Sequence, residues 1–168
     1  MVQDNGYGHG SVEVANVALA NGAQLLLVSN LDEAVELREA GIVEQIILMG
    51  ERMEEELPLC IELNLTLAIG EPSIAKEASR LANLLGKKIS VHVKVDTGMG
   101  RYGMRWDRAF EMLQSIEGYC WEKVFLMHLS KDCNDIKKVQ DRFSNLKGHG
   151  TRFSTFVVDP STDLTIPI

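Results

Sequence analysis

Two stretches of this 168-residue chain carry side chains whose types and spacing could do chemistry. The first is YGHG, residues 7–10, which leads directly into a helical pattern. Backbone N–H groups of Gly8 and Gly10, the Tyr7 hydroxyl and the positive end of the helix dipole together suit an anion such as phosphate. Glycines in such a turn can also serve the backbone alone, because glycine adopts positive φ without strain. A phosphate site and a purely structural turn are therefore both open.

The second stretch is HVKVDTGMGRYG, residues 92–103, in which His92, Lys94 and Asp96 alternate along an expected strand. Charged side chains on a buried strand are destabilising unless they are paired or functional. In a barrel, inward residues at the carboxyl ends of strands face the site. A structural network that pairs Lys94 with Asp96 or with Arg101 is the alternative.

His128 ends another expected strand, in VFLMHLS. A histidine there is as compatible with a hydrogen-bonded core side chain as with an acid–base or ring-stacking group. It would join the same site if its strand neighbours the strand of Lys94. The acidic run at residues 53–56 is interpreted as a solvated helix start without a function.

Helical and strand patterns alternate along the chain and must position these residues. We expect helices over 11–22, 31–41, 53–64, 71–88, 105–118 and 134–148, and strands over 24–30, 44–50, 65–70, 89–96, 121–130 and 154–158. The strand over 24–30 should be buried on both faces. This alternation predicts a parallel sheet. The sheet could be open and doubly wound, or closed as a (β/α)8 barrel, which typically takes about 250 residues.

Some details of these elements are also expected. The first helix should carry Val14, Val17 and Ala18 on one face and end at Gly22, and Gly41 should end the second. Pro58 should interrupt or restart the third. The chain looks cut short at its C-terminus. A first strand would be expected before the glycine-rich loop that ends in YGHG, but only Met1 and Val2 precede that loop.

Composition excludes some classes of partner. A net charge of −7 disfavours binding to nucleic acid or to an anionic membrane surface, which needs clustered Lys and Arg. Cys60, Cys120 and Cys133 form no CxxC pair, so we expect reduced thiols and no metal site. Without a signal peptide or an apolar run of about 20 residues, the expected location is cytoplasmic. Small molecules or proteins are the expected partners.

Four segments, YGHGSVEVA, LDEAVELREAGI, HVKVDTGMGRYG and MHLSKD, together resemble the N-terminal barrel domain of alanine racemases. These pyridoxal-phosphate (PLP) enzymes interconvert L- and D-alanine, and the similarity covers residues 2–147 in unbroken order. The resemblance implies an α/β fold of the PLP-binding (β/α)8 TIM-barrel type, incomplete here with six or seven βα units. Residues 1–168 would form one truncated barrel domain without the family's C-terminal β domain, and could associate as a homodimer or larger assembly.

The resemblance also implies roles for particular residues. Tyr7 would hydrogen-bond the PLP phosphate, and His128 would lie next to the cofactor ring. Arg101 would lie beside the ring oxygen and the substrate carboxylate, a role that suits its rigid guanidinium group. Lys94 matches a lysine that is often carbamylated in the family, which would turn it into an anion able to orient Arg101.

One departure from the family concerns the reacting group itself. The family lysine that carries PLP as a Schiff base stands four residues before the tyrosine of YGHG, where this chain has Gln3. An amide nitrogen cannot form an imine with an aldehyde, so covalent attachment is expected to be lost. The opposing catalytic tyrosine of the family belongs to a region beyond this chain, so no catalytic residue is intact and the two-base proton shuttle lacks both partners.

Three interpretations follow from this departure. The first is an alanine-racemase-like barrel domain that is inactive as this chain. The second is a module that binds PLP or another phosphorylated ligand non-covalently. The third is one part of a multi-chain amino-acid racemase, in which another chain would have to supply the lysine.

Overall fold

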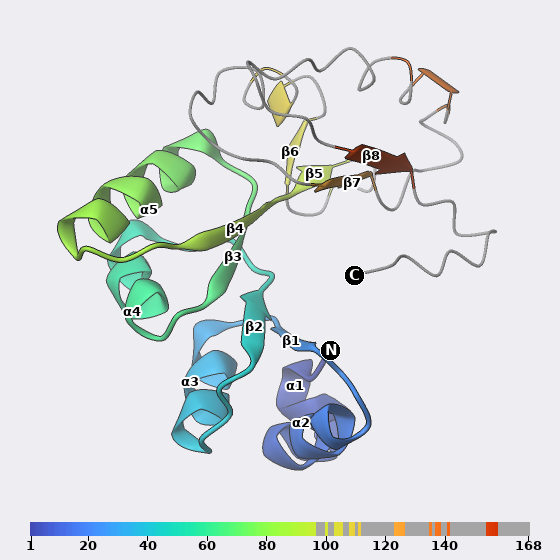
Figure 1. Cartoon of the computed structure of the whole chain (residues 1–168), viewed down its shortest axis with the longest axis vertical. Helices are drawn as coiled ribbons and strands as arrows, with labels where there is room; N and C mark the ends of the chain where they lie inside the picture. The colour runs from blue at the N-terminus through green and yellow to red at the C-terminus, as the bar shows by residue number, and fades with distance from the viewer. Residues whose placement is uncertain are drawn as a thin grey trace. The chain divides into compact units, whose positions relative to one another are not determined.

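The computed structural model describes residues 1–96, 100, 103–105, 108–109, 111, 123–126, 135, 137–138, 141 and 154–157 (Figure 1). The chain divides into two compact units, Met1–Lys94 and Val95–Ile168, which are described separately. Arg101 and His128 lie outside the described residues.

The first unit alternates helices and strands. Its helical elements are α1 (Gln3–Gly8), α2 (Ser11–Ala20), α3 (Leu31–Glu39), the 3₁₀ turn η1 (Glu54–Glu56), α4 (Leu57–Glu62) and α5 (Pro72–Leu84). Its strands are β1 (Leu25–Val28), β2 (Gln45–Leu48), β3 (Thr66–Ile69) and β4 (Ser90–Val93). The predicted alternation is confirmed in this unit.

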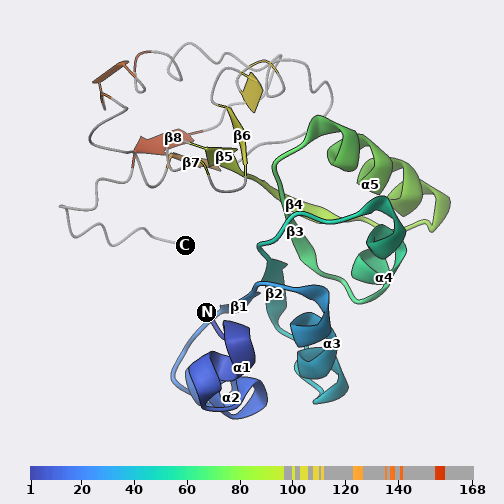
Figure 2. The same ribbon diagram turned by 180° about the vertical axis from the view of Figure 1, so that it is seen from behind.

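The four strands form one parallel sheet in the order β1-β2-β3-β4. Helices α3, α4 and α5, which connect successive strands, lie on the same side of the sheet (Figures 1 and 2). A doubly wound sheet reverses its strand order and carries helices on both faces, whereas a barrel keeps one direction of winding. Of the two predicted architectures, the described part of the sheet has the winding of a barrel.

The core lies between the sheet and the helices of this unit, α2 included, whose Ala15 belongs to it. Strand residues that face it alternate along each strand, as the two-residue repeat of a strand requires. Leu37 of α3, Leu57 of α4 and Ala78 of α5 pack onto them. Six strand residues of this core are at most 3% exposed: Leu26, Val28, Ile46, Leu48, Leu67 and Ile69. In β1 the intervening Leu25 and Leu27 are only partly buried, so the expected burial on both faces is not complete there.

The apolar face predicted for α2 is not evenly buried. Val17 is 64% exposed, while Ser11 and Ala15 are the buried residues of the helix. Residues four apart share a helix face, but Val17 is two residues beyond Ala15 and therefore points to the other side. Val14 is partly buried against the core, as expected.

Two predicted helix boundaries are confirmed. Gly41 has φ 83°, and the N–H groups of Gly41 and Ile42 donate to the carbonyls of Arg38 and Leu37 at 3.0 and 3.1 Å, which is a Schellman ending. Pro58 lies in the first turn of α4, directly after η1, so it restarts the helix as expected.

In the second unit, β5 (Val95–Asp96) pairs in parallel with β6 (Met104–Arg105), and β7 (Lys123–Leu126) pairs in parallel with β8 (Ser154–Val157). The predicted strand over 89–96 is thus two strands, β4 and β5, that belong to different sheets. The sequence does not predict β6, whereas β7 and β8 lie within the strands predicted over 121–130 and 154–158. No helix in the described part of the chain is both long and apolar enough to cross a membrane.

Candidate functional site

The carboxyl edge of the four-stranded sheet brings two sequence-predicted residues to the same side of the fold. The N–H of Val2 donates to the carbonyl of Leu27 at 2.8 Å, which places Gln3 beside the end of β1. The N–H of Lys94 donates to the carbonyl of Ile69 at 2.8 Å, which places Lys94 at the ends of β3 and β4. In parallel α/β folds, this edge carries the ligand sites.

The side chain of Gln3 is held by a residue that follows β1. The hydroxyl of Ser29 donates to Oε1 of Gln3 at 2.6 Å. This bond directs a carboxamide, whose nitrogen lone pair is delocalised, to the edge of the sheet. Position 3 therefore offers hydrogen bonding but no nucleophile.

Within the element labelled α1, the residues after Gln3 do not form a right-handed helix but a left-handed turn. Asp4, Asn5, Gly6 and Tyr7 have φ between 52° and 60° and ψ between 36° and 53°. Each left-handed residue other than glycine costs roughly 1–2 kcal/mol, least for Asn and Asp. Residues 4–7, called the left-handed turn from here on, must therefore be stabilised by their surroundings.

Hydrogen bonds to neighbouring residues close the left-handed turn. They are Gly6 N–H to Val2 O (3.2 Å), His9 N–H to Gly6 O (3.2 Å), Gly10 N–H to Asn5 O (2.9 Å) and Ser11 N–H to Asn5 Oδ1 (3.2 Å). The amide of Gly10 is thus already engaged, which corrects the expectation that it is offered to a phosphate. A phosphate at this turn would therefore not be held by the amide of Gly10.

The side chain of Tyr7 could contact a phosphate instead. Tyr7 is 58% exposed, and its hydroxyl donates to the sulfur of Met1 at 3.0 Å. A thioether is a weak acceptor, so a phosphate oxygen could readily replace it. The described residues therefore fit a phosphate held non-covalently by Tyr7, whereas the amide of Gln3 does not fit covalent attachment of PLP.

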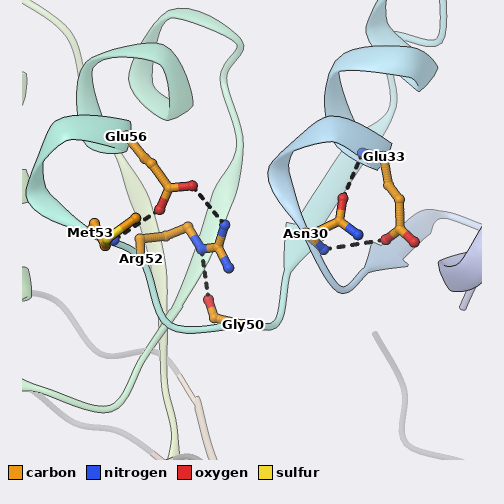
Figure 3. A network of polar contacts seen from close by, with 6 residues as sticks. All are labelled: Asn30, Glu33, Gly50, Arg52, Met53 and Glu56. Atoms are coloured by element: carbon orange, nitrogen blue, oxygen red, sulfur yellow. Dashed lines mark hydrogen bonds and ion pairs between the residues drawn. The ribbon is translucent and has the colours of Figure 1, made fainter.

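Glu33 joins the left-handed turn to the start of α3. Its Oε1 accepts the N–H of Asp4 at 2.6 Å, and its Oε2 accepts the N–H groups of Ser29 and Asn30 at 2.8 and 3.3 Å. Asn30 completes a reciprocal capping box, because its Oδ1 accepts the N–H of Glu33 at 2.9 Å (Figure 3). Glu33 is only 8% exposed.

The loop after β2 is stabilised by a second polar network (Figure 3). Nε of Arg52 donates to the carbonyl of Gly50 at 3.1 Å, and Nη1 of Arg52 lies 3.2 Å from Oε1 of Glu56. The other oxygen of Glu56 accepts the N–H of Met53 at 2.9 Å. Two of the residues in the run 53–56, Met53 and Glu56, thus have a structural role that the sequence did not indicate.

Of the other candidate residues, His92 lies in the described part of the chain and two do not. Arg101 and His128 lie outside the described residues, so their expected roles stay predictions. β7, which precedes His128, pairs with β8. His92 is an exposed residue of β4, so the expectation that it lies on a buried strand is wrong, although partial desolvation by the surrounding protein still lowers the pKa of its imidazole. The described residues contain no group of His, Cys, Asp and Glu that could hold a metal ion.

Ser29 and Glu33 were missed by sequence reasoning. The spacing of Asn30 and Glu33 is that of a capping box, which could have identified the start of α3. Nothing in the sequence, however, indicated that the same carboxylate reaches the turn at Asp4, 29 residues away.

Comparison with known proteins gives a consistent result. The family model described as alanine racemase, N-terminal domain, matches residues 1–151. An alanine racemase of Methanococcus maripaludis is 34% identical over 173 aligned residues, covering 100% of this chain and 44% of that protein. One from Halalkalibacterium halodurans is 39% identical and covers 86% of this chain and 39% of that protein. The chain thus spans less than half the length of these relatives.

Solved structures agree. The alanine racemase of Clostridium difficile 630 matches with a TM-score of 0.73 and 26% identity, covering 93% of this chain and 44% of that one. The alanine racemase from E. faecalis matches with a TM-score of 0.65 and 36% identity, covering 85% and 41%. The parallel sheet of the first unit covers part of the barrel of these enzymes. The chain therefore belongs to the family of the alanine racemase N-terminal domain, a PLP-binding TIM barrel.

Proposed function

We propose that residues 1–168 act as one barrel domain of the alanine racemase type that binds PLP non-covalently and does not racemise alanine by itself. The observation that carries this proposal is the hydrogen bond of 2.6 Å from Ser29 to the Gln3 carboxamide at the carboxyl edge of the sheet. When bound to a racemase, PLP acts as an electron sink that stabilises a carbanion at the amino-acid α-carbon. That chemistry also needs an amine on the protein and two groups that move a proton.

The residues of this chain would divide the work of binding. Tyr7 would donate its hydroxyl to the phosphate, and Arg101 would pair with the ring oxygen, by analogy with the family. His128 would lie against the ring. Lys94 would be carbamylated and orient Arg101, a modification that ¹³C NMR with labelled bicarbonate would detect as a new carbamate signal.

The test compares the natural chain with Gln3→Lys. Each protein is titrated with PLP, reduced with borohydride and digested, and labelled lysines are mapped by mass spectrometry. We expect the natural chain to bind PLP reversibly, without one specifically labelled lysine and without racemisation above buffer. Gln3→Lys should be labelled at position 3, because it supplies the amine that the Gln3 carboxamide cannot provide. Gln3→Met, of similar size and without an amine, is the control and should stay unlabelled.

Tyr7→Phe tests the phosphate contact. Loss of one charge-assisted hydrogen bond should weaken PLP binding roughly tenfold. Three results would overturn the proposal: no binding at millimolar PLP, one specific lysine labelled in the natural chain, or racemisation far above the buffer rate.

A further inference from the structure

We propose that Glu33 is a positioning residue for ligand binding, because it holds the left-handed turn in the shape that presents Tyr7. The choice of PLP as the ligand rests on the proposed function, whereas the contacts of Glu33 with the turn do not depend on it. Glu33 takes no part in the cofactor contacts expected from the family.

The contacts of Glu33 require a carboxylate. Both of its oxygens accept backbone N–H groups, Oε1 from Asp4 and Oε2 from Ser29 and Asn30. A carboxamide of the same shape would have to present its own N–H₂ group to one of these donors. Glutamine at position 33 should keep its single oxygen at the start of α3, where two N–H groups donate to it, and so leave the N–H of Asp4 facing an N–H₂ group without an acceptor.

These contacts connect Glu33 to two residues beside Gln3: Asp4, which follows it in the chain, and Ser29, which hydrogen-bonds its side chain. Asp4 is the first residue of the left-handed turn and follows Gln3 directly. Ser29, whose N–H also donates to Glu33, uses its hydroxyl to hold the Gln3 side chain. One buried carboxylate thus determines the path of the backbone at Asp4 and the place of the residue that orients Gln3.

Strain makes the turn dependent on this support. Asp4, Asn5 and Tyr7 have positive φ, which residues with a side chain rarely adopt without compensation. The bond from Asp4 to Glu33 has an ionised acceptor, which makes it one of the stronger contacts of the turn. Without it, Asp4 can relax towards ordinary φ, and the direction of the chain up to Tyr7 changes with it.

Glu33→Gln tests the proposal with two controls on the same helix. Glu36→Gln makes the same chemical change at an exposed position. Arg38→Met removes hydrogen bonds to the carbonyls of Leu63, Ile42, Glu44 and Asn64, and so destabilises the same unit without touching the turn. Amide hydrogen exchange of the ligand-free protein, thermal unfolding and PLP titration are measured for each.

We expect Glu33→Gln to speed exchange at the Asp4 amide and to weaken PLP binding roughly tenfold, as loss of a charge-assisted bond predicts. Arg38→Met should lower the melting temperature and leave the affinity unchanged, and Glu36→Gln should change neither. The proposal is overturned if exchange at Asp4 is unchanged in Glu33→Gln, or if Arg38→Met loses as much affinity as Glu33→Gln.

The exchange measurement needs no ligand, so it separates this inference from the proposed function. A natural chain that binds no PLP would end the proposed function and the ligand-binding role of Glu33, while exchange at Asp4 still decides its role in the turn. If Glu33→Gln does not fold, Glu33→Asp replaces it, because it keeps the carboxylate but is one methylene shorter. We expect Glu33→Asp also to speed exchange at the Asp4 amide and to weaken PLP binding.

Discussion

Gly50 lies directly against the carbonyl oxygen of Ser29. A Cβ on Gly50 would be 2.7 Å from that oxygen and 2.6 Å from Nη2 of Arg52. The arginine could move, but the carbonyl could not shift without moving Ser29, which contacts both Gln3 and Glu33. The close approach of the loops after β1 and β2 therefore requires glycine at this position.

Gly50→Ala should lower the free energy of unfolding by about 1–3 kcal/mol, the usual effect of overpacking. The measurement is chemical denaturation followed by circular dichroism. Glu55→Ala, an exposed change in the following segment, is the control and should have little effect. An unchanged unfolding free energy in Gly50→Ala would show that the two loops can separate freely.

Arg38→Met should destabilise the first unit by roughly 1–3 kcal/mol, because it leaves backbone carbonyls without their donor. The guanidinium donates to Ile42 and Glu44 at 2.7 and 2.9 Å and to Leu63 at 3.0 Å. Arg80→Met, which removes an exposed partner of Glu77 on α5, is a matched control. Equal stability of the two variants in denaturant would contradict the prediction.

Cys60 should react with a thiol reagent only when the chain unfolds. Its side chain is 0% exposed, and burial raises the pKa of the thiol to about 11. The reactive thiolate is therefore scarce in the folded protein at about pH 8. A variant with Cys120→Ser and Cys133→Ser isolates Cys60, and its labelling rate is measured against denaturant. Rapid labelling without denaturant would contradict the buried position.

His92 should make stability depend on pH. Desolvation lowers its pKa in the folded state from an ordinary value of 6.5, so the unfolded chain binds the proton more readily. The stabilisation is present above about pH 6.5 and is lost as the pH falls towards the lowered pKa. Unfolding curves between about pH 7.5 and 5.5 should show a weaker decline in His92→Gln than in the natural chain. Ser90→Ala, at an exposed position of the same strand that carries no titratable group, should leave the decline unchanged; equal slopes in all three proteins would refute the prediction.

Much of the fold could be predicted because its signals are local. The apolar run at Leu25–Val28 and the helix at Leu31–Glu39 are each encoded within a short window, and both were placed correctly. The exposure of Val17 could not be predicted, because the periodic pattern does not tell which side of a mostly apolar helix meets the core. The break at Lys94 was missed because a continuous apolar and charged alternation does not reveal where a strand changes its partner.

The sequence by itself determined what position 3 can do: a glutamine amide cannot become the amine that PLP chemistry needs, whatever surrounds it. Only the tertiary structure decided where that amide lies and what shapes the turn after it. The bond from Ser29 to Gln3 spans 26 residues and that from Asp4 to Glu33 spans 29. Such contacts depend on the register of parallel strands and on the loops at their carboxyl ends, which bring together residues that no local pattern connects.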